Sequence, residues 1–397
     1  MPCNLDLYPT DFPATSATGV DAISLELLEQ ERTAEAIAIA ILQNQRTYGY
    51  DISMVQDAVQ GGGLNALMPI SVVSGAAKTA PKPVGSKGFF GGGFLPSSLG
   101  ATIIDRMTFI DKTVSRLGYG FSNRRAIVGT FASKQSAYWA GGIASDIDKI
   151  SFDTESVTKI GTVIETGPNV HSAGLTSRLA GYVAGGQDVA YNYFTVTSVQ
   201  KVTFSNDAIT LLAARLLSPA WGAIGLSSAP AGYVAGGQIG FSPAVAGINK
   251  LTYSSEAISL LGTGLLLARR NSAGVNAPLA GYVAGGLGTS GFFGGVQGGS
   301  SNGVSYSSIE KLIYANESIS MIGATTGEPM WCVTAMNNNL YGYFGGGFSF
   351  INNISSFLSK INEFDIAGES ISLLGMGFSD PRCCSDGAAN YSPGWGD

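Results

Sequence analysis

The segment GYVAGGQIGFSPAVAGINKLTYSSEAI, residues 232–258, contains the two motifs that decide the fold of this chain. The first motif is a short apolar run with one aromatic residue that ends in a glycine pair. The second has the form I-x-K-L-x-Y-x-x-E-A-I, in which two runs of β-branched or aromatic residues flank a turn. Runs of this length and composition are typical of β-strands. Both motifs recur along the 397 residues, which indicates a protein built from β-repeats.

The aromatic residue before the glycine pair occurs six times, at intervals of 49, 44, 51, 49 and 61 residues. A period near fifty that is built on glycine and aromatic signals is typical of the four-stranded blades of a β-propeller. The six residues are Phe89, Tyr138, Tyr182, Tyr233, Tyr282 and Tyr343.

The second motif supplies a more regular interval. Its basic residue lies 32 or 33 residues before the next aromatic residue, so variation in length is confined to the segment between the glycine pair and the basic residue. In the sixth copy the same interval reaches Trp395, which predicts that the chain ends at the start of a second strand within a blade. The basic position is occupied by Arg106, Lys149, Lys201, Lys250 and Lys311, and by Glu363 in the sixth copy.

These intervals predict an all-β, six-bladed propeller over residues 81–397, with GYVAGG, KLTYS and EAISLL as strands two, three and four of a blade. Residues 382–390 match a first strand, so the C-terminus is expected to complete the blade that Phe89 opens, with residues 70–77 as a competitor. A β-solenoid is the alternative, but its coils need shorter and more even repeats. A helical repeat is excluded because the glycine pairs would interrupt its helices.

The glycine pairs and the aromatic third strand resemble the kelch repeat family over about residues 70–397. The chain departs from the family pattern by having Ile258 or its equivalents in the region where kelch repeats carry a tryptophan. The motifs GYFGGG, IxKLxFSxE and LxxAR also resemble those of the kelch-type repeat proteins encoded by tailed bacteriophages, especially phages of cyanobacteria. That resemblance implies an association with virion and tail structures. The third-strand aromatic residues are Phe109, Phe152, Phe204, Tyr253 and Tyr314.

Residues 1–80 are predicted to form a separate, mainly α-helical segment that ends in a linker. Within residues 20–45, apolar side chains recur every three, four or seven positions, which predicts an amphipathic helix. A single apolar face of this size cannot be buried by the helix alone. We therefore expect it to dock on the propeller, on another copy of the chain or on a different protein. The face consists of Ile23, Leu27, Ala34, Ile37 and Ile41.

An acidic residue follows the third strand in five of the six copies, and Lys112 takes its place in the first. The acidic groups allow two interpretations. They line a channel and bind a cation, or each caps a hairpin turn or pairs with a basic residue of the neighbouring blade. The second interpretation is favoured, because cross-strand and surface ion pairs are the common use of recurring charges. The acidic residues are Glu155, Asp207, Glu256, Glu317 and Glu369.

Composition and the scarcity of reactive side chains argue against several functional classes. Charged residues make up 13% and the net charge is −6 with no basic block, which argues against nucleic-acid binding. His171 is the only histidine, so multi-histidine metal centres are excluded and a structural role in a first strand is favoured. Cys3, Cys332, Cys383 and Cys384 show no metal-binding or disulfide spacing. The N-terminus predicts neither a signal peptide nor a membrane span.

Arginines recur at the head of the first strand, so the repeat explains their spacing. Glycosidase chemistry needs two carboxylates that converge on one site, and no such pair stands out. The sequence therefore predicts no catalytic residue, no metal and no cofactor. The arginines are Arg124, Arg125, Arg269, Arg270 and Arg382.

The longest connections between second and third strands are residues 187–198 and 287–308. Because strands alternate in direction, these loops are expected on the same face as the connections between blades. Their aromatic residues lie amid glycine and serine, a composition typical of adaptable contact surfaces. Folding back onto the blade is the equal alternative. The residues are Tyr191, Tyr193, Phe194, Phe292, Phe293 and Tyr306.

We therefore expect a non-enzymatic structural or adhesion component of a phage virion that is assembled in the host cytoplasm. The N-terminal segment is expected to dock to other virion proteins or to copies of itself. The propeller would serve as a display or packing module, with a host-surface glycan or protein as a further partner. The alternative is a soluble lectin-like or protein-binding propeller outside a virion.

Overall fold

The computed structural model describes residues 85–98, 100–142, 144–163, 169–188, 194–218, 221–240, 242–288, 304–351 and 354–395, which lie in the compact unit Pro83–Asp397. The predicted amphipathic helix, its apolar face and the boundary near residue 80 lie outside these residues and stay predictions. The described regular structure consists of β-strands and one short 3₁₀ helix. In this part of the chain no helix is long and apolar enough to cross a membrane.

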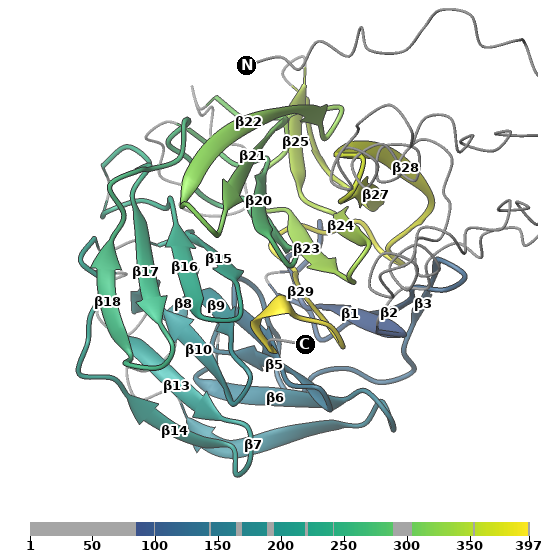
Figure 1. Cartoon of the computed structure of the whole chain (residues 1–397). Coiled ribbons are helices and arrows are strands. Elements are labelled where there is room, and N and C mark those ends of the chain that lie inside the picture. The colour runs from purple at the N-terminus through teal and green to yellow at the C-terminus, as the bar shows by residue number, and fades with distance from the viewer. Residues whose placement is uncertain are drawn as a thin grey trace, which may run out of the picture. The chain divides into compact units, whose positions relative to one another are not determined.

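Six four-stranded antiparallel sheets surround a central axis as the blades of a propeller (Figure 1). Blade 4 shows the pattern. From the axis outward it contains Ile224–Ser227 (β15), Ala231–Ala235 (β16), Ile248–Thr252 (β17) and Ala257–Leu260 (β18). The GYVAGG, KLTYS and EAISLL segments thus form strands two, three and four. The predicted all-β, six-bladed propeller is confirmed.

The other five blades have the same order from the axis outward. Blade 1 comprises Asp386–Ala389 (β29), Lys87–Gly91 (β1), Ile104–Thr108 (β2) and Thr113–Arg116 (β3). Blade 2 comprises Gly129–Ala132 (β4), Ser136–Ala140 (β5), Asp146–Ser151 (β6) and Val157–Val163 (β7). Blade 3 comprises Ala173–Thr176 (β9), Ala180–Ala184 (β10), Val199–Thr203 (β13) and Ala208–Leu211 (β14). Blade 5 comprises Ala273–Asn276 (β19), Ala280–Ala284 (β20), Ser308–Ile313 (β21) and Ser318–Thr325 (β22). Blade 6 comprises Thr334–Asn337 (β23), Tyr341–Gly345 (β24), Lys360–Asp365 (β27) and Ser370–Gly377 (β28).

The C-terminal strand closes the ring. Strand β29 pairs antiparallel with β1, so that Ala388 lies opposite Phe89, and the first blade is built from both ends of the described chain. Figure 1 shows the yellow β29 beside the dark blue β1. The predicted closure by residues 382–390 is confirmed.

The prediction that Trp395 begins a second strand is wrong. After β29 the chain turns into the 3₁₀ helix Pro393–Trp395. The Trp395 side chain is buried in a cluster with Phe89 and Trp139, and its indole N–H donates to the Ala132 carbonyl at 3.1 Å. Because β1 already occupies the second position of that blade, the tail instead packs on the ends of other first strands. The 32-residue spacing to Trp395 is therefore not a blade repeat.

Stacked aromatic rings join neighbouring blades and explain the regular interval. The strand-two aromatic of one blade lies on the aromatic that follows strand three of the next blade, as for Tyr182 and Tyr253, whose ring centroids are 5.4 Å apart. At the joint between blades 5 and 6, Ile366 takes the aromatic position, and Tyr282 meets Phe364 edge-on. The other stacks are Phe89–Phe152, Tyr138–Phe204, Tyr233–Tyr314 and Phe109–Tyr343.

A ring of ion pairs follows the same joints. In each joint the strand-three residue at the basic position pairs with the charged residue in the hairpin turn between strands three and four of the next blade. The interpretation as inter-blade pairs is confirmed. The cation-channel interpretation is wrong, because these turns lie away from the first strands that surround the axis. The pairs are Arg106–Glu155, Lys149–Asp207, Lys201–Glu256, Lys250–Glu317, Lys311–Glu369 and Glu363–Lys112.

All six charged turn residues adopt a left-handed backbone, with φ between 46° and 59°. Glycine adopts this conformation most readily, and other residues lose roughly 1 kcal/mol or more by doing so. Glycine has no side chain to reach the next blade. The ion pair thus explains why a strained position carries Lys, Asp or Glu in every blade.

Three blades contain a fully buried ion pair between the segment before strand one and strand three. Three of the five arginines predicted at the head of the first strand supply the cations; of the other two, Arg270 lies 4.6 Å from the Trp221 ring and Arg124 is exposed. The amide residues Gln200, Asn249 and Asn362 occupy the acidic position in the remaining blades. The pairs are Arg382–Asp105 in blade 1, Arg125–Asp148 in blade 2 and Arg269–Glu310 in blade 5.

One residue from each blade forms a closed ring of hydrogen bonds around the axis, which we call the axial ring. Each residue lies two positions before its first strand, has φ between 52° and 66°, and donates its backbone N–H to the carbonyl of the preceding blade's residue at 2.7–3.0 Å. The residues are Ile127, His171, Gly222, Asn271, Cys332 and Cys384. The six blades are thus joined at the axis by backbone contacts as well as at their outer joints.

Candidate functional site

Two parts of the propeller carry features beyond this frame: one face and the cavity on the axis. The face, which we call the loop face, holds the connections between strands two and three and those between blades. In blade 3 it carries a small sheet of Asn169–Val170 (β8), Gln187–Asp188 (β11) and Phe194–Thr195 (β12). In blade 6 it carries a hairpin of Phe348–Ile351 (β25) and Ile354–Phe357 (β26). In blades 3 and 6, described residues of the variable-length segments thus form extra structure on this face.

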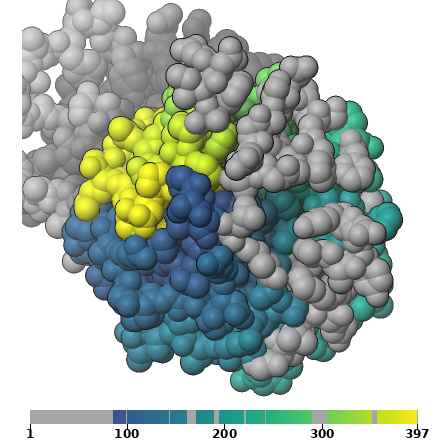
Figure 2. Space-filling model, turned by 180° about the vertical axis from the view of Figure 1, so that it is seen from behind, coloured from purple at the N-terminus to yellow at the C-terminus, as the bar shows by residue number. Residues whose placement is uncertain are grey.

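The loop face is seen in Figure 2, behind the view of Figure 1. There the dark blue residues from the first described part of the chain lie beside yellow residues near the C-terminal end. A two-way backbone bridge between Phe94 and Cys383 makes this contact. The connections of blade 1 are thus fixed to the segment that leads into β29.

The aromatic residues predicted for this face behave differently where they are described. Phe194 is 69% exposed. Tyr306 folds back onto blade 5: it is half-buried, and the guanidinium of Arg269 lies 5.0 Å from its ring centroid. The remaining four, Tyr191, Tyr193, Phe292 and Phe293, lie outside the described residues. The candidate contact surface therefore rests on Phe194 and stays a prediction for those four.

His171 is a half-buried residue at the head of a first strand, in the structural role predicted for it. Its ring meets Trp221 edge-on at 4.9 Å, and the guanidinium of Arg270 lies 4.6 Å from the Trp221 ring. Burial, followed by the nearby charge of Arg270, lowers the pKa of His171 to about 3, and a hydrogen bond with the Asn271 side chain opposes this shift. The imidazole is therefore neutral at ordinary pH and suits packing rather than proton transfer near neutrality.

The axial cavity has a volume of about 150 Å³ and is lined by the first strands of all six blades. Small residues bring these strands close together. A side-chain carbon at Gly174 would lie 1.9 Å from the Thr130 carbonyl, and one at Gly225 would lie 2.0 Å from the Gly174 carbonyl. Typical small-molecule pockets measure roughly 300–1,000 Å³. The cavity is therefore sized for a small guest.

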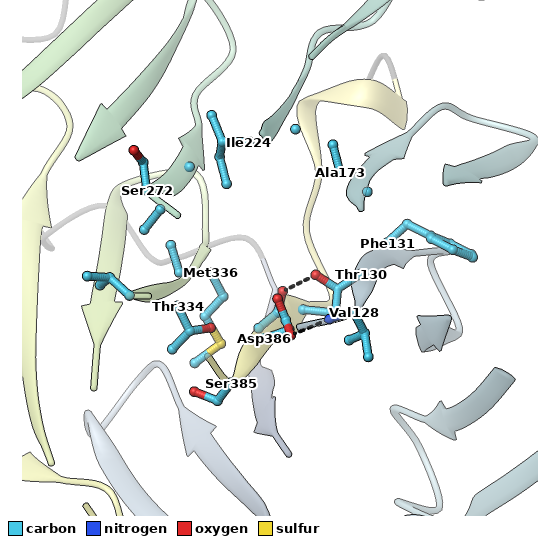
Figure 3. Close-up of a pocket in the computed structure, with 18 of the residues that line it drawn as sticks. Val128, Thr130, Phe131, Ala173, Ile224, Ser272, Thr334, Met336, Ser385 and Asp386 are labelled. Carbon is cyan, nitrogen blue, oxygen red and sulfur yellow. Dashed lines mark hydrogen bonds between the residues drawn. The ribbon is translucent and has the colours of Figure 1, made fainter. Parts of the chain in front are cut away.

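Asp386 supplies the carboxyl group on the cavity wall. Figure 3 shows it beside Val128 and Thr130 of blade 2, across the opening from Ile224. Its Oδ2 accepts the backbone N–H of Val128 at 3.0 Å, while the Thr130 hydroxyl donates to the Gly387 carbonyl at 3.1 Å. Its exposed surface faces the cavity. Burial raises the pKa of Asp386 to about 7, against the lowering effect of the Val128 hydrogen bond.

Further polar atoms on the cavity wall have no hydrogen-bond partner among the described residues. They are the hydroxyls of Ser172, Thr334 and Ser385 and Nδ1 of His171. Buried polar groups are nearly always paired, so these atoms favour a polar guest over an apolar one. No described group of three or more His, Cys, Asp or Glu side chains is arranged to hold a metal ion.

Neither the axial ring nor Asp386 was predicted from the sequence. The ring positions hold six residues of five different types, so no motif marks them. The position of Asp386 in the first strand is Gly129 in blade 2 and Ile224 in blade 4, so the repeat does not single it out. The left-handed Gly222 is the one glycine among the ring residues, and on its own it is an ordinary turn signal.

Comparison with known proteins supports the fold alone. No protein-family model matches the sequence, and no curated protein matches it. The solved structure of YjhT is similar to this chain with a TM-score of 0.55 and 13% identity, and the match covers 68% of this chain and 88% of that one. Since 508 solved chains match, the propeller is a common frame and does not define an activity.

Proposed function

We propose that this chain is a non-enzymatic structural or adhesion component of a phage virion. The N-terminal segment docks to the particle, and the kelch-like propeller serves as a rigid display or packing module. One observation carries the proposal: a uniform six-blade frame holds its elaborations, the β8–β11–β12 sheet and the β25–β26 hairpin, on a single face. The resemblance of the repeat motifs to those of phage-encoded kelch-type proteins supports a role in a virion.

The frame suits a display role because its joints are repetitive and closed. Each joint combines an ion pair with an aromatic or aliphatic contact between blades, and β29 removes the open edge of β1. The remaining open strand edges are those of the outermost strand of each blade, and radial repetition keeps such edges short. Loops mounted on such a frame are held in fixed relative positions, which lowers the entropy lost when they bind a partner.

Particle assembly tests the docking role. Double replacement of Leu27 and Ile37 by glutamine removes apolar side chains from the predicted docking face, and incorporation into particles is expected to fall at least tenfold. Glutamine at Glu29 and Arg32, on the opposite side of the same predicted helix, is the matched control and should leave incorporation unchanged. Normal incorporation of the Leu27/Ile37 variant, or of a chain lacking residues 1–80, would overturn the docking role.

The second candidate function is a lectin-like or protein-binding propeller outside a virion. The 69% exposure of Phe194 on the loop face favours it, since exposed aromatic rings bind both sugars and apolar protein surfaces. A glycan array with the whole chain separates the two. Specific retention that Phe194→Ala abolishes would support the lectin. Retention of no glycan, together with incorporation into particles, would support the virion protein.

A further inference from the structure

Cys332 and Cys384 are neighbours in the axial ring, where blade 6 meets blade 1. The backbone N–H of Cys384 donates to the Cys332 carbonyl at 2.8 Å. A hydrogen bond of this length between the two backbones leaves the Cα atoms roughly 5–6 Å apart, within the range that a disulfide spans. The two residues are separated by 51 others along the chain, so their spacing in the sequence carries no sign of this contact.

The two side chains are also neighbours. Cys332 and Cys384 belong to one buried cluster, and both residues line the axial cavity. Both are more than nine-tenths buried and are free thiols. Cys383 belongs to the same cluster but is not among the residues that line the cavity. A bond between these two successive residues would close a small strained ring, so the geometry favours the pair that spans two blades.

We propose that Cys332 and Cys384 form a reversible disulfide across the joint between blades 6 and 1 when the protein meets a small oxidant such as hydrogen peroxide. One thiolate attacks a peroxide oxygen and becomes a sulfenic acid, with loss of hydroxide. The second thiolate then attacks the sulfenic sulfur, forms the S–S bond and releases a second hydroxide. The two thiol protons neutralise both hydroxides. Two thiols and one peroxide thus give one disulfide and two waters.

The surroundings set the conditions for this reaction. Burial raises the pKa of both thiols, so little thiolate is present at neutral pH, and in a reducing compartment the pair stays reduced. Peroxide is small enough for a 150 Å³ cavity, whereas a tripeptide disulfide is not. The bond would tie β29, the strand that closes the ring, to the start of β23, and so fix the inner edge of the closing joint.

The test uses the full-length protein treated with hydrogen peroxide at pH 8, followed by non-reducing peptide mapping. A Cys332–Cys384 cross-linked peptide that dithiothreitol removes is the expected result. The oxidised protein should unfold roughly 3–8 °C higher than the reduced one, because the bond restricts the unfolded chain. Glutathione disulfide should react far more slowly than peroxide.

The controls distinguish this pair from the other thiols. Cys383→Ala should keep both the cross-link and the thermal shift, whereas Cys332→Ala and Cys384→Ala should lose both. Because the primary measurement is made on the unaltered protein, a variant that fails to fold does not affect the conclusion. Recovery of only Cys383–Cys384 or Cys3-containing links, of sulfinic acids, or of unmodified thiols would overturn the proposal.

Discussion

The Nζ of Lys112 lies 2.6 Å from Oε1 of Glu363, and this ion pair joins blade 6 to blade 1. Here the acidic residue is on the strand and the basic residue is in the turn. In the other five joints the strand is basic and the turn is acidic. Glu363 is only 11% exposed, so the pair is partly shielded from solvent. Lys112 would meet a basic partner, and Glu363 an acidic one, at any other joint. The reversed charges at this joint therefore favour packing of blade 1 against blade 6 over packing of either blade against a different neighbour at this surface.

Reversal of one member of this pair should destabilise the ring, and reversal of both should restore it. Lys112→Glu places two acidic groups at the joint, and we expect the free energy of unfolding to fall by about 1–2 kcal/mol. The double variant Lys112→Glu with Glu363→Lys recreates the arrangement of the other joints and should lie within about 0.5 kcal/mol of the parent. Chemical denaturation measures the parent, the two single variants Lys112→Glu and Glu363→Lys, and the double variant. A double variant as unstable as the sum of its singles would contradict the explanation.

The propeller frame could be predicted because its signals lie in the repeat itself. The glycine pairs, the aromatic residues and the basic position located strands two, three and four, and the acidic turn was correctly interpreted as an inter-blade partner. The exceptions Lys112 and Glu363 were visible, but the two were not linked. They lie 251 positions apart and meet only because the ring closes between blades 6 and 1.

The parts that were missed depend on contacts that no repeat specifies. Trp395 fits the 32-residue interval, yet β1 already forms the second strand of that blade. The interval alone cannot show that two segments match the same strand position. Asp386 and the axial ring occupy positions whose residue types differ from blade to blade. Their roles arise where six first strands converge, which only the three-dimensional arrangement reveals.

Removal of one member of the buried Arg269–Glu310 pair should destabilise the protein more than replacement of both members. Both side chains are fully buried, and the Arg269 Nη2 donates to Oε1 of Glu310 at 2.7 Å. Glu310→Gln leaves an uncompensated buried guanidinium and should cost about 3–5 kcal/mol. Blade 6 has Met330 and Asn362 at the equivalent positions. The double variant Arg269→Met with Glu310→Asn therefore gives blade 5 the same uncharged pair of residues that blade 6 already contains. Urea unfolding should show the double variant as the more stable of the two. The opposite order would show that the charged pair itself is required.

Close approach of the first strands predicts a position-dependent cost of adding one methyl group. At Gly174 the new Cβ would lie 1.9 Å from the Thr130 carbonyl, so Gly174→Ala must push two backbones apart and should cost at least 3 kcal/mol. Gly323, in the outer strand β22, has no atom within 4 Å of the same position. Gly323→Ala is the matched control and should change stability by less than about 1 kcal/mol in either direction. Thermal unfolding of both variants checks the difference, and equal effects would contradict the close packing at the axis.

Asp386 should make the stability of the propeller depend on pH. Its pKa is about 7 in the folded protein and about 4 when unfolded, so between these values the folded state binds more protons. Its contribution therefore lowers the free energy of unfolding as pH rises from about 4 to about 7 and is constant above that, with a total of a few kcal/mol at most.

Asp386→Asn removes the ionisable group and should flatten this part of the profile, so that the variant gains stability relative to the parent at pH 8. Asp153→Asn, at an exposed turn, is the control and should leave the slope unchanged. Parallel profiles for the parent and Asp386→Asn would show that the carboxyl group stays ionised at the cavity wall.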